Sequence, residues 1–176
     1  MNPQKQTTGW TVARCWLVFA GVAVGLLGAR AAAAQDAPAQ PQPIAVEPHQ
    51  VDGVEVALME VKRTSGETVT VKWRYRNLTD EAKEDLGHGG SGMYAWRLAV
   101  GAYLLDTKNK TKLEVVKDAD GQPIAARNET MAFSAKIGPK ETVNTWAKFA
   151  APPADVKTVT VNLPGAAPFE DVTISE

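Results

Sequence analysis

The chain has 176 residues, of which 44% are hydrophobic, and its 19 basic and 20 acidic residues give a net charge of −1. Its single cysteine excludes an internal disulfide framework. The balanced charge offers no basic surface of the kind that neutralises phosphates, so we expect no nucleic-acid partner.

Residues 1–34 have the pattern of a secretory signal peptide. Lys5 and Arg14 give a positively charged start, and the apolar run "CWLVFAGVAVGLLGA" follows at residues 15–29. This run has the length of a signal-peptide core and is short for a membrane span. We therefore expect export to the periplasm or the extracellular space.

Cleavage is expected directly after Ala34, because Ala32 and Ala34 supply the small residues that signal peptidase requires. The alternative is an uncleaved segment that anchors the chain in the inner membrane, the one case in which a membrane partner is expected. Residues 1–34 hold the only cysteine, three of the 19 basic residues and no acidic residue, so the remainder carries a net charge of −4. Its stability must come from a packed core.

Residues 35–50, "QDAPAQPQPIAVEPHQ", are rich in Pro, Ala and Gln. Such a segment buries too little apolar surface to offset the entropy of ordering. We interpret it as a disordered linker, and residues 51–176 as one domain.

The alternation of apolar and polar residues predicts strands in this domain. In "ETVTVKWRYR", residues 67–76, every second residue is apolar, as in a strand with one buried face. Val54, Val56 and Leu58 alternate in the same way, and "RTSGE" supplies a turn between the two runs.

The run "YAWRLAVGAYLL", residues 94–105, is apolar at nearly every position and predicts a central strand covered on both faces. Turn signals then recur in "DTKNKTK", "KDADGQP" and "IGPKET". No helical periodicity long enough for a crossover is present. The expected fold is all-β, an immunoglobulin-like antiparallel β-sandwich of about seven or eight strands, with a closed lipocalin-type barrel as the alternative.

The C-terminal stretch "WAKFAAPPADVKTVTVNLPGAAPFEDVTI", residues 146–174, resembles the closing strands of small exported immunoglobulin-like domains in bacterial envelope and secreted proteins. The resemblance implies an envelope or extracellular setting. Some of these relatives carry an OmpA-like peptidoglycan-binding domain beside this one, and we expect no such domain here. A shared fold does not by itself imply an activity.

The stretch "GHGGSG", residues 87–92, is similar to the oxyanion loop of esterases. Acyl transfer also needs a Gly-x-Ser-x-Gly elbow, and Met93 stands where its last glycine would be. Outside the predicted linker, His88 is the only histidine that could serve Ser91 in a triad. We therefore expect no catalytic residues, and a hydrolase using the His88–Ser91 loop is the least favoured alternative.

The loop of residues 79–92 is instead interpreted as a recognition or spacer loop, since binding residues commonly lie on loops of rigid β scaffolds. Asp85, His88, Ser91 and Tyr94 are its candidate partner-binding residues.

Two further patterns are weak. Asp118–Gly121 opens like a calcium loop but lacks the distal ligands, so an Asp-Gly turn is expected there and no metal or cofactor site is predicted. Trp73, Trp96 and Trp146 would suit a sugar-stacking platform, but we interpret them as core or half-buried strand residues.

The sequence thus favours a non-catalytic exported module of the bacterial cell envelope that binds or scaffolds a protein or another envelope component, through its loops or a sheet edge. A small-ligand carrier with a barrel cavity is the alternative.

Overall fold

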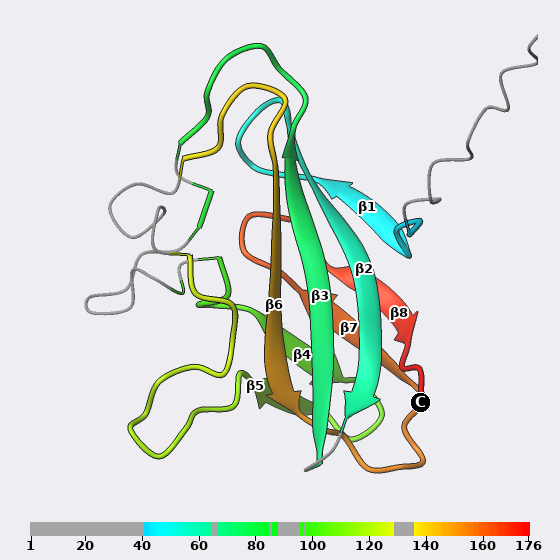
Figure 1. Cartoon of the computed structure of the whole chain (residues 1–176). Helices are drawn as coiled ribbons and strands as arrows, with labels where there is room; N and C mark the ends of the chain where they lie inside the picture. Colours follow the sequence, from blue (N-terminus) through cyan, green and yellow to red (C-terminus); the bar gives the residue numbers. More distant parts are fainter. Residues whose placement is uncertain (1–40, 65–66, 85, 88–95, 97, 129–135) are drawn as a thin grey trace, which may run out of the picture. The chain divides into compact units, whose positions relative to one another are not determined.

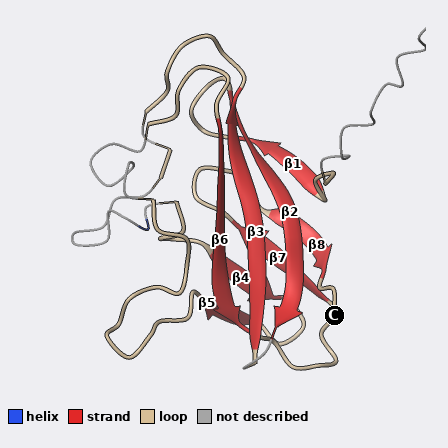
Figure 2. Ribbon diagram, in the orientation of Figure 1, coloured by secondary structure: helices blue, strands red, loops and turns tan. Residues whose placement is uncertain are grey.

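A computed structural model describes residues 41–64, 67–84, 86–87, 96, 98–128 and 136–176. In these residues it is all-β, with strands joined by turns and loops (Figures 1 and 2). The strands are β1 (Ala45–Pro48), β2 (Val54–Thr64), β3 (Thr68–Asn77), β4 (Tyr103–Asp106), β5 (Thr111–Glu114), β6 (Thr142–Ala150), β7 (Thr158–Asn162) and β8 (Phe169–Thr173).

The strands form two four-stranded antiparallel sheets. The first has the order β1-β2-β3-β6 and the second the order β5-β4-β7-β8. Figure 1 shows the first sheet in front of the second, as two layers. The predicted all-β sandwich is confirmed, and the described strands do not close into the alternative barrel. The immunoglobulin-like topology stays a prediction.

The hairpin β2–β3 is the longest paired unit and confirms the alternation in the sequence. Leu58 lies opposite Trp73 and both are buried, whereas Glu60 lies opposite Lys72 on the other face. The register shifts between Leu58 and Glu60, so Met59 is the extra residue of a β-bulge. The buried face of this hairpin forms one wall of the core.

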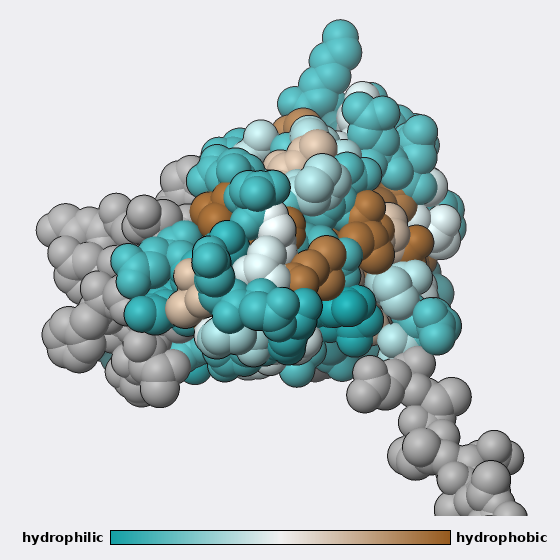
Figure 3. All heavy atoms as spheres, turned by 90° about the horizontal axis from the view of Figure 1, so that it is seen from above, coloured by the Kyte–Doolittle hydropathy of each residue, from teal (hydrophilic) through white to brown (hydrophobic). Residues whose placement is uncertain are grey.

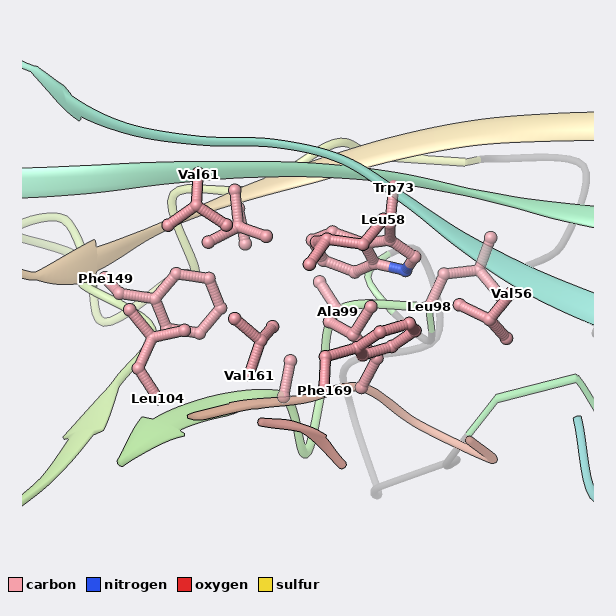
Figure 4. Close-up of a cluster of buried hydrophobic side chains, with 14 of the residues drawn as sticks. Val56, Leu58, Val61, Trp73, Leu98, Ala99, Leu104, Phe149, Val161 and Phe169 are labelled. Carbon is pink, nitrogen blue, oxygen red and sulfur yellow. The ribbon is translucent and has the colours of Figure 1, made fainter. Parts of the chain in front are cut away.

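The core lies between the two sheets (Figure 4). Trp73 and Leu58 come from the first sheet, and Leu104, Val161 and Phe169 come from the second. Each is at most 2% exposed. Burying such a side chain stabilises the fold by about 1.5–3 kcal/mol relative to leaving it in water.

The linker prediction was wrong at its C-terminal end. Residues 45–48 form β1, which pairs antiparallel with β2 from Ala45 opposite Leu58 to Pro48 opposite Glu55. His49, which the same prediction placed in the linker, is only 6% exposed. The prolines in this stretch argued against a strand. An edge strand tolerates proline, however, because one side of its backbone needs no partner.

The central strand predicted at residues 94–105 was also too long. Only Tyr103–Asp106 is a strand, and the described residues before it form turns in which Ala99 and Val100 donate backbone hydrogen bonds to Trp96 O at 2.8 and 2.9 Å. Gly101, with φ of 89°, ends the turn. Leu98 and Ala99 are buried through core packing without strand pairing.

The polar turn signals were correct. Asp106 is 1% exposed and accepts the backbone N–H of Asn109 at 3.0 Å, which fixes the β4–β5 turn. Asp118 accepts the N–H groups of Asp120 and Gln122 at 3.0 and 2.8 Å. Gly121 adopts φ of 77°, as an Asp-Gly turn requires.

The register of β3 can be tested with adjacent substitutions. Trp73 is 1% exposed, so Trp73→Ala should lower the free energy of unfolding by about 3–5 kcal/mol. The Lys72 side chain is 53% exposed and pairs only with Glu60, so Lys72→Ala should cost under about 0.5 kcal/mol. Urea unfolding of both variants measures the difference. Similar losses would contradict the observed register.

Candidate functional site

The candidate site is a groove between the edge strands β1 and β8, which lie on the same side of the sandwich (Figure 1). Its volume is about 510 Å³. Strand β1 ends the first sheet and β8 ends the second, so neither has a strand on its outer side. The lining residues are Ile44, Ala45, Glu47, Phe169, Glu170, Asp171, Val172, Thr173 and Ser175.

Backbone contacts join the two sheets on this side of the sandwich, one group after β1 and one after β8. Next to β1, His49 forms an isolated bridge with Ala166, and Gln50 N donates to Gly165 O at 2.7 Å. After β8, Ser175 N donates to Val61 O at 2.9 Å. These contacts fix the two edge strands relative to each other, so the groove is a preformed feature.

Strand β8 presents unpaired backbone groups at the groove. Ile174 N donates to Lys157 O at 2.9 Å, which directs Ile174 toward β7. Backbone groups alternate in direction along an antiparallel strand, so those of Thr173 point away from β7, as those of Ser175 do. Within the described part of the chain, no hydrogen bond pairs the N–H of Thr173 with a further strand.

Strand β1 is a poorer template for an added strand. His49 N donates to Val54 O at 2.9 Å, so the backbone groups of Val46 and Pro48 point away from β2. Proline has no N–H, which leaves Val46 as the outward donor between these two positions. A proline at this position is a common means of blunting a sheet edge.

The groove is acidic. Glu47, Glu170 and Asp171 line it, and no lysine or arginine is among its lining residues. Glu47 is half-buried, and no ion pair between described residues involves any of these three carboxylates. Asp171 has φ of 50°, a strained conformation for a residue with a side chain, where β8 departs from regular pairing.

A buried histidine follows β1 and lines a neighbouring hollow. Val51 N donates to His49 Nδ1 at 2.9 Å, so the proton of the neutral ring lies on Nε2, which donates to Leu86 O at 3.2 Å. Gly165, with φ of 77°, lies against this ring, and a Cβ atom there would overlap the imidazole. The glycine is therefore required for the close approach.

Tyr75 supports the same end of the sandwich. Its ring meets His49 edge-on with centroids 5.7 Å apart, and its hydroxyl donates to Pro164 O at 3.2 Å. Burial raises the pKa of the Tyr75 hydroxyl, which therefore stays protonated and keeps this donor at physiological pH. A hollow of about 620 Å³ adjoins this cluster, lined by His49, Tyr103 and the segment 162–167.

The predicted partner-binding residues Asp85, His88, Ser91 and Tyr94 lie outside the described residues. The described part of the 79–92 loop is more than a spacer. Leu86 is 0% exposed, and residue 83 pairs with residue 137. Asn77, 2% exposed, donates to Glu81 O and Gly138 O and so holds the base of the loop. Removing the whole loop would therefore remove part of the core.

Other predicted features are separated in the structure. Trp73 is in the core, Trp96 is half-buried with Arg127 4.9 Å above its ring, and Trp146 is 37% exposed. The expectation that all three tryptophans are core or half-buried residues was thus wrong for Trp146. Among the residues that the structure places, no group of three or more His, Cys, Asp or Glu side chains is arranged to hold a metal ion.

A scan of protein families, a search of curated proteins and a search of solved structures each found no match to this chain. In the described ranges, no helix is long and apolar enough to cross a membrane.

The predicted linker contains β1, which forms one wall of the groove, and the buried His49 that follows it. Apolar alternation gave no signal for this strand, because Val46 is exposed whereas Ala45 and Glu47 are half-buried.

The contact between His49 and residue 165 can be tested with two glycines that share φ of 77°. Gly121→Ala should cost about 1 kcal/mol of stability, because it meets only the backbone strain and no atom lies within 4 Å. Gly165→Ala adds an overlap with a buried ring and should cost about 3 kcal/mol or more. Thermal unfolding of the two variants compares them. Equal losses would mean that the imidazole does not constrain this turn.

Proposed function

We propose that this protein is a non-catalytic, exported binding module that holds an extended segment of a partner protein in the groove between β1 and β8. The observation that carries the proposal is the free edge of β8 inside a preformed groove. An extended segment can pair with such an edge through main-chain hydrogen bonds, while its alternate side chains enter the groove.

The lining of the groove indicates the chemistry of the segment. Ile44, which is 52% exposed, supplies apolar surface to the groove, and Glu47 adds a half-buried carboxylate without a described cationic partner. A segment that alternates apolar and basic residues would satisfy both, because successive side chains of a strand point to opposite faces. Charge complementarity of this kind favours the correct partner and speeds its association.

The cellular setting forms part of the same proposal. The signal pattern of residues 1–34 supports export, and the resemblance of residues 146–174 supports an immunoglobulin-like domain of the bacterial envelope. The partner is then a protein or another component of that compartment.

Binding can be measured by fluorescence anisotropy with two labelled octapeptides, one of alternating Lys and Val and one of alternating Glu and Val. The Lys-Val peptide should bind and the Glu-Val peptide should not. Glu47→Lys should weaken binding by about tenfold, because it reverses the charge at the half-buried position. Thr173→Pro should weaken it at least as much by removing an edge N–H.

The matched control is Glu114→Lys, which makes the same charge change on the exposed side chain of β5, away from the groove. It should bind the Lys-Val peptide like the unaltered protein. Equal binding of both peptides, or equal loss in both lysine variants, would refute the groove as the binding site.

Cleavage after Ala34 should give an exported protein that begins at Gln35. The small residues Ala32 and Ala34 follow the apolar run at the spacing that signal peptidase requires. Intact-mass measurement of the protein recovered from the periplasm or medium tests this. A mass equal to the full 176 residues would favour the membrane-anchored alternative.

A further inference from the structure

The outer face of the β1-β2-β3-β6 sheet carries a second feature, separate from the groove. Figure 1 views this face, with β6, β3 and β2 in front. Trp146 lies on it opposite Lys72, and at 37% exposure it is the only large aromatic residue exposed in the described part of the chain. A shallow hollow of about 390 Å³ contains it, together with Met59, Arg74 and Asn144.

Backbone pairing on both sides fixes the main chain of Trp146. Strand β6 pairs with β3 on one side, and on the other Ala126 N donates to Trp146 O at 2.8 Å. Lys148, two residues further along the strand, donates to Ile124 O at 2.9 Å and accepts from Val116 N at 2.8 Å. A main chain that is already fixed loses little conformational entropy when a ligand binds.

Arg74 adds a cation without a partner. It is half-buried and lies opposite Asn144, yet no described residue forms an ion pair or a side-chain hydrogen bond with it, and its Nε is buried without an acceptor. Its neighbours on the same face are paired: Arg76 with Glu55 at 3.0 Å and Lys72 with Glu60 at 3.1 Å. A guanidinium has fixed donor geometry that matches a carboxylate.

The whole face is basic. The strand register gives it an excess of cations over carboxylates within the described strands. The cations are Lys62, Lys72, Arg74, Arg76 and Lys148, and the carboxylates are Glu55 and Glu60. The net charge of this face is opposite in sign to that of the groove, so the two surfaces suit ligands of different charge.

From this arrangement we propose that the outer face binds an acidic polysaccharide whose sugars carry carboxylates. The apolar C–H face of a pyranose ring packs on the indole of Trp146. The carboxylate of the same or the next sugar accepts hydrogen bonds from Arg74, and the amide of Asn144 bonds a ring hydroxyl.

The exposed apolar side chains favour a glycan over a lipid surface. Ile44 and Val46, which are 52% and 43% exposed, lie together at β1, whereas Leu78, which is 45% exposed, follows β3. Figure 3, from above, shows hydrophobic residues as separate patches among hydrophilic ones. Membrane-docking surfaces gather several apolar side chains among cations. The hollow around Trp146 is instead lined mainly by polar and charged side chains, and its indole matches the width of one sugar ring.

Isothermal titration calorimetry with an alginate hexasaccharide tests the proposal, with cellohexaose as the neutral probe of equal length. Alginate should bind more tightly than cellohexaose, and its affinity should fall with added salt because the contacts are exposed. Trp146→Ala should reduce the affinity for both sugars at least tenfold. Arg74→Gln should reduce the affinity for alginate about tenfold and leave that for cellohexaose unchanged.

Arg76→Gln is the matched control, because Arg76 is on the same strand and face but already pairs with Glu55. It should change alginate binding less than twofold. Melting temperatures of the Trp146 and Arg74 variants should stay close to that of the unaltered protein, which separates binding from folding. Equal affinity for both sugars, equal effects of the two arginine variants, or binding of phosphatidylglycerol vesicles without binding of alginate would overturn the proposal.

Discussion

The buried imidazole of His49 is the contact on which this side of the sandwich depends. It lies where three segments meet: the end of β1, the turn at Gly165 and the loop residue Leu86. A buried polar ring is tolerated only when its nitrogens find partners, and both do so here. Because the ring occupies the space that a Cβ of residue 165 would need, the end of β1 can approach the turn before β8 closely. The groove between β1 and β8 lies next to this contact.

A groove between two paired strands differs from a binding surface on loops in how much of the protein must become ordered when a partner binds. An added segment would find its main-chain partners already positioned, so less of the interaction energy is lost in ordering the protein. The isolated bridge between Lys62 and Ser175 has the same effect beyond β8. Strand addition has a risk, since a free edge also invites pairing with other copies of the chain. The outward proline of β1 and the like charges of Glu170 and Asp171 oppose such pairing.

The parts of the fold that depend on local pattern were predictable from the sequence. Strand β3 alternates strictly and β2 alternates on either side of its bulge, and the turns after Asp106 and Asp118 use side chains that bond their own backbone. Strand β1 was missed because its inward residues include Glu47 whereas the apolar Val46 points outward. Residues 94–105 were predicted as one strand because an apolar run is buried equally well in a turn.

The groove was not predictable, because its walls and ends lie far apart in the sequence. Local patterns carry no information on which edge strands meet, or that Gln50 bonds Gly165 and Val61 bonds Ser175. Arg63 makes the same point: its guanidinium donates to three backbone carbonyls, those of Pro152, Pro153 and Val156, about ninety residues away. From the sequence alone, Arg63 would be interpreted as an ordinary surface arginine. In the structure its three hydrogen bonds fix the bend before β7.

The net charge of the chain was equally uninformative about the charge of the ligands that its surfaces would bind. A value of −1 for the chain averages an acidic groove with a basic sheet face. Exposed charges act over about one Debye length, roughly 8 Å at physiological salt, so a ligand at one surface responds mainly to the side chains beside it. Glu47 and Arg74 lie on opposite faces of their sheet, because Glu47 pairs with inward Val56 and Arg74 with outward Ala57. One sheet can therefore present a carboxylate to an enclosed basic segment and a guanidinium to an exposed acidic ligand, and neither site weakens the other through its charge.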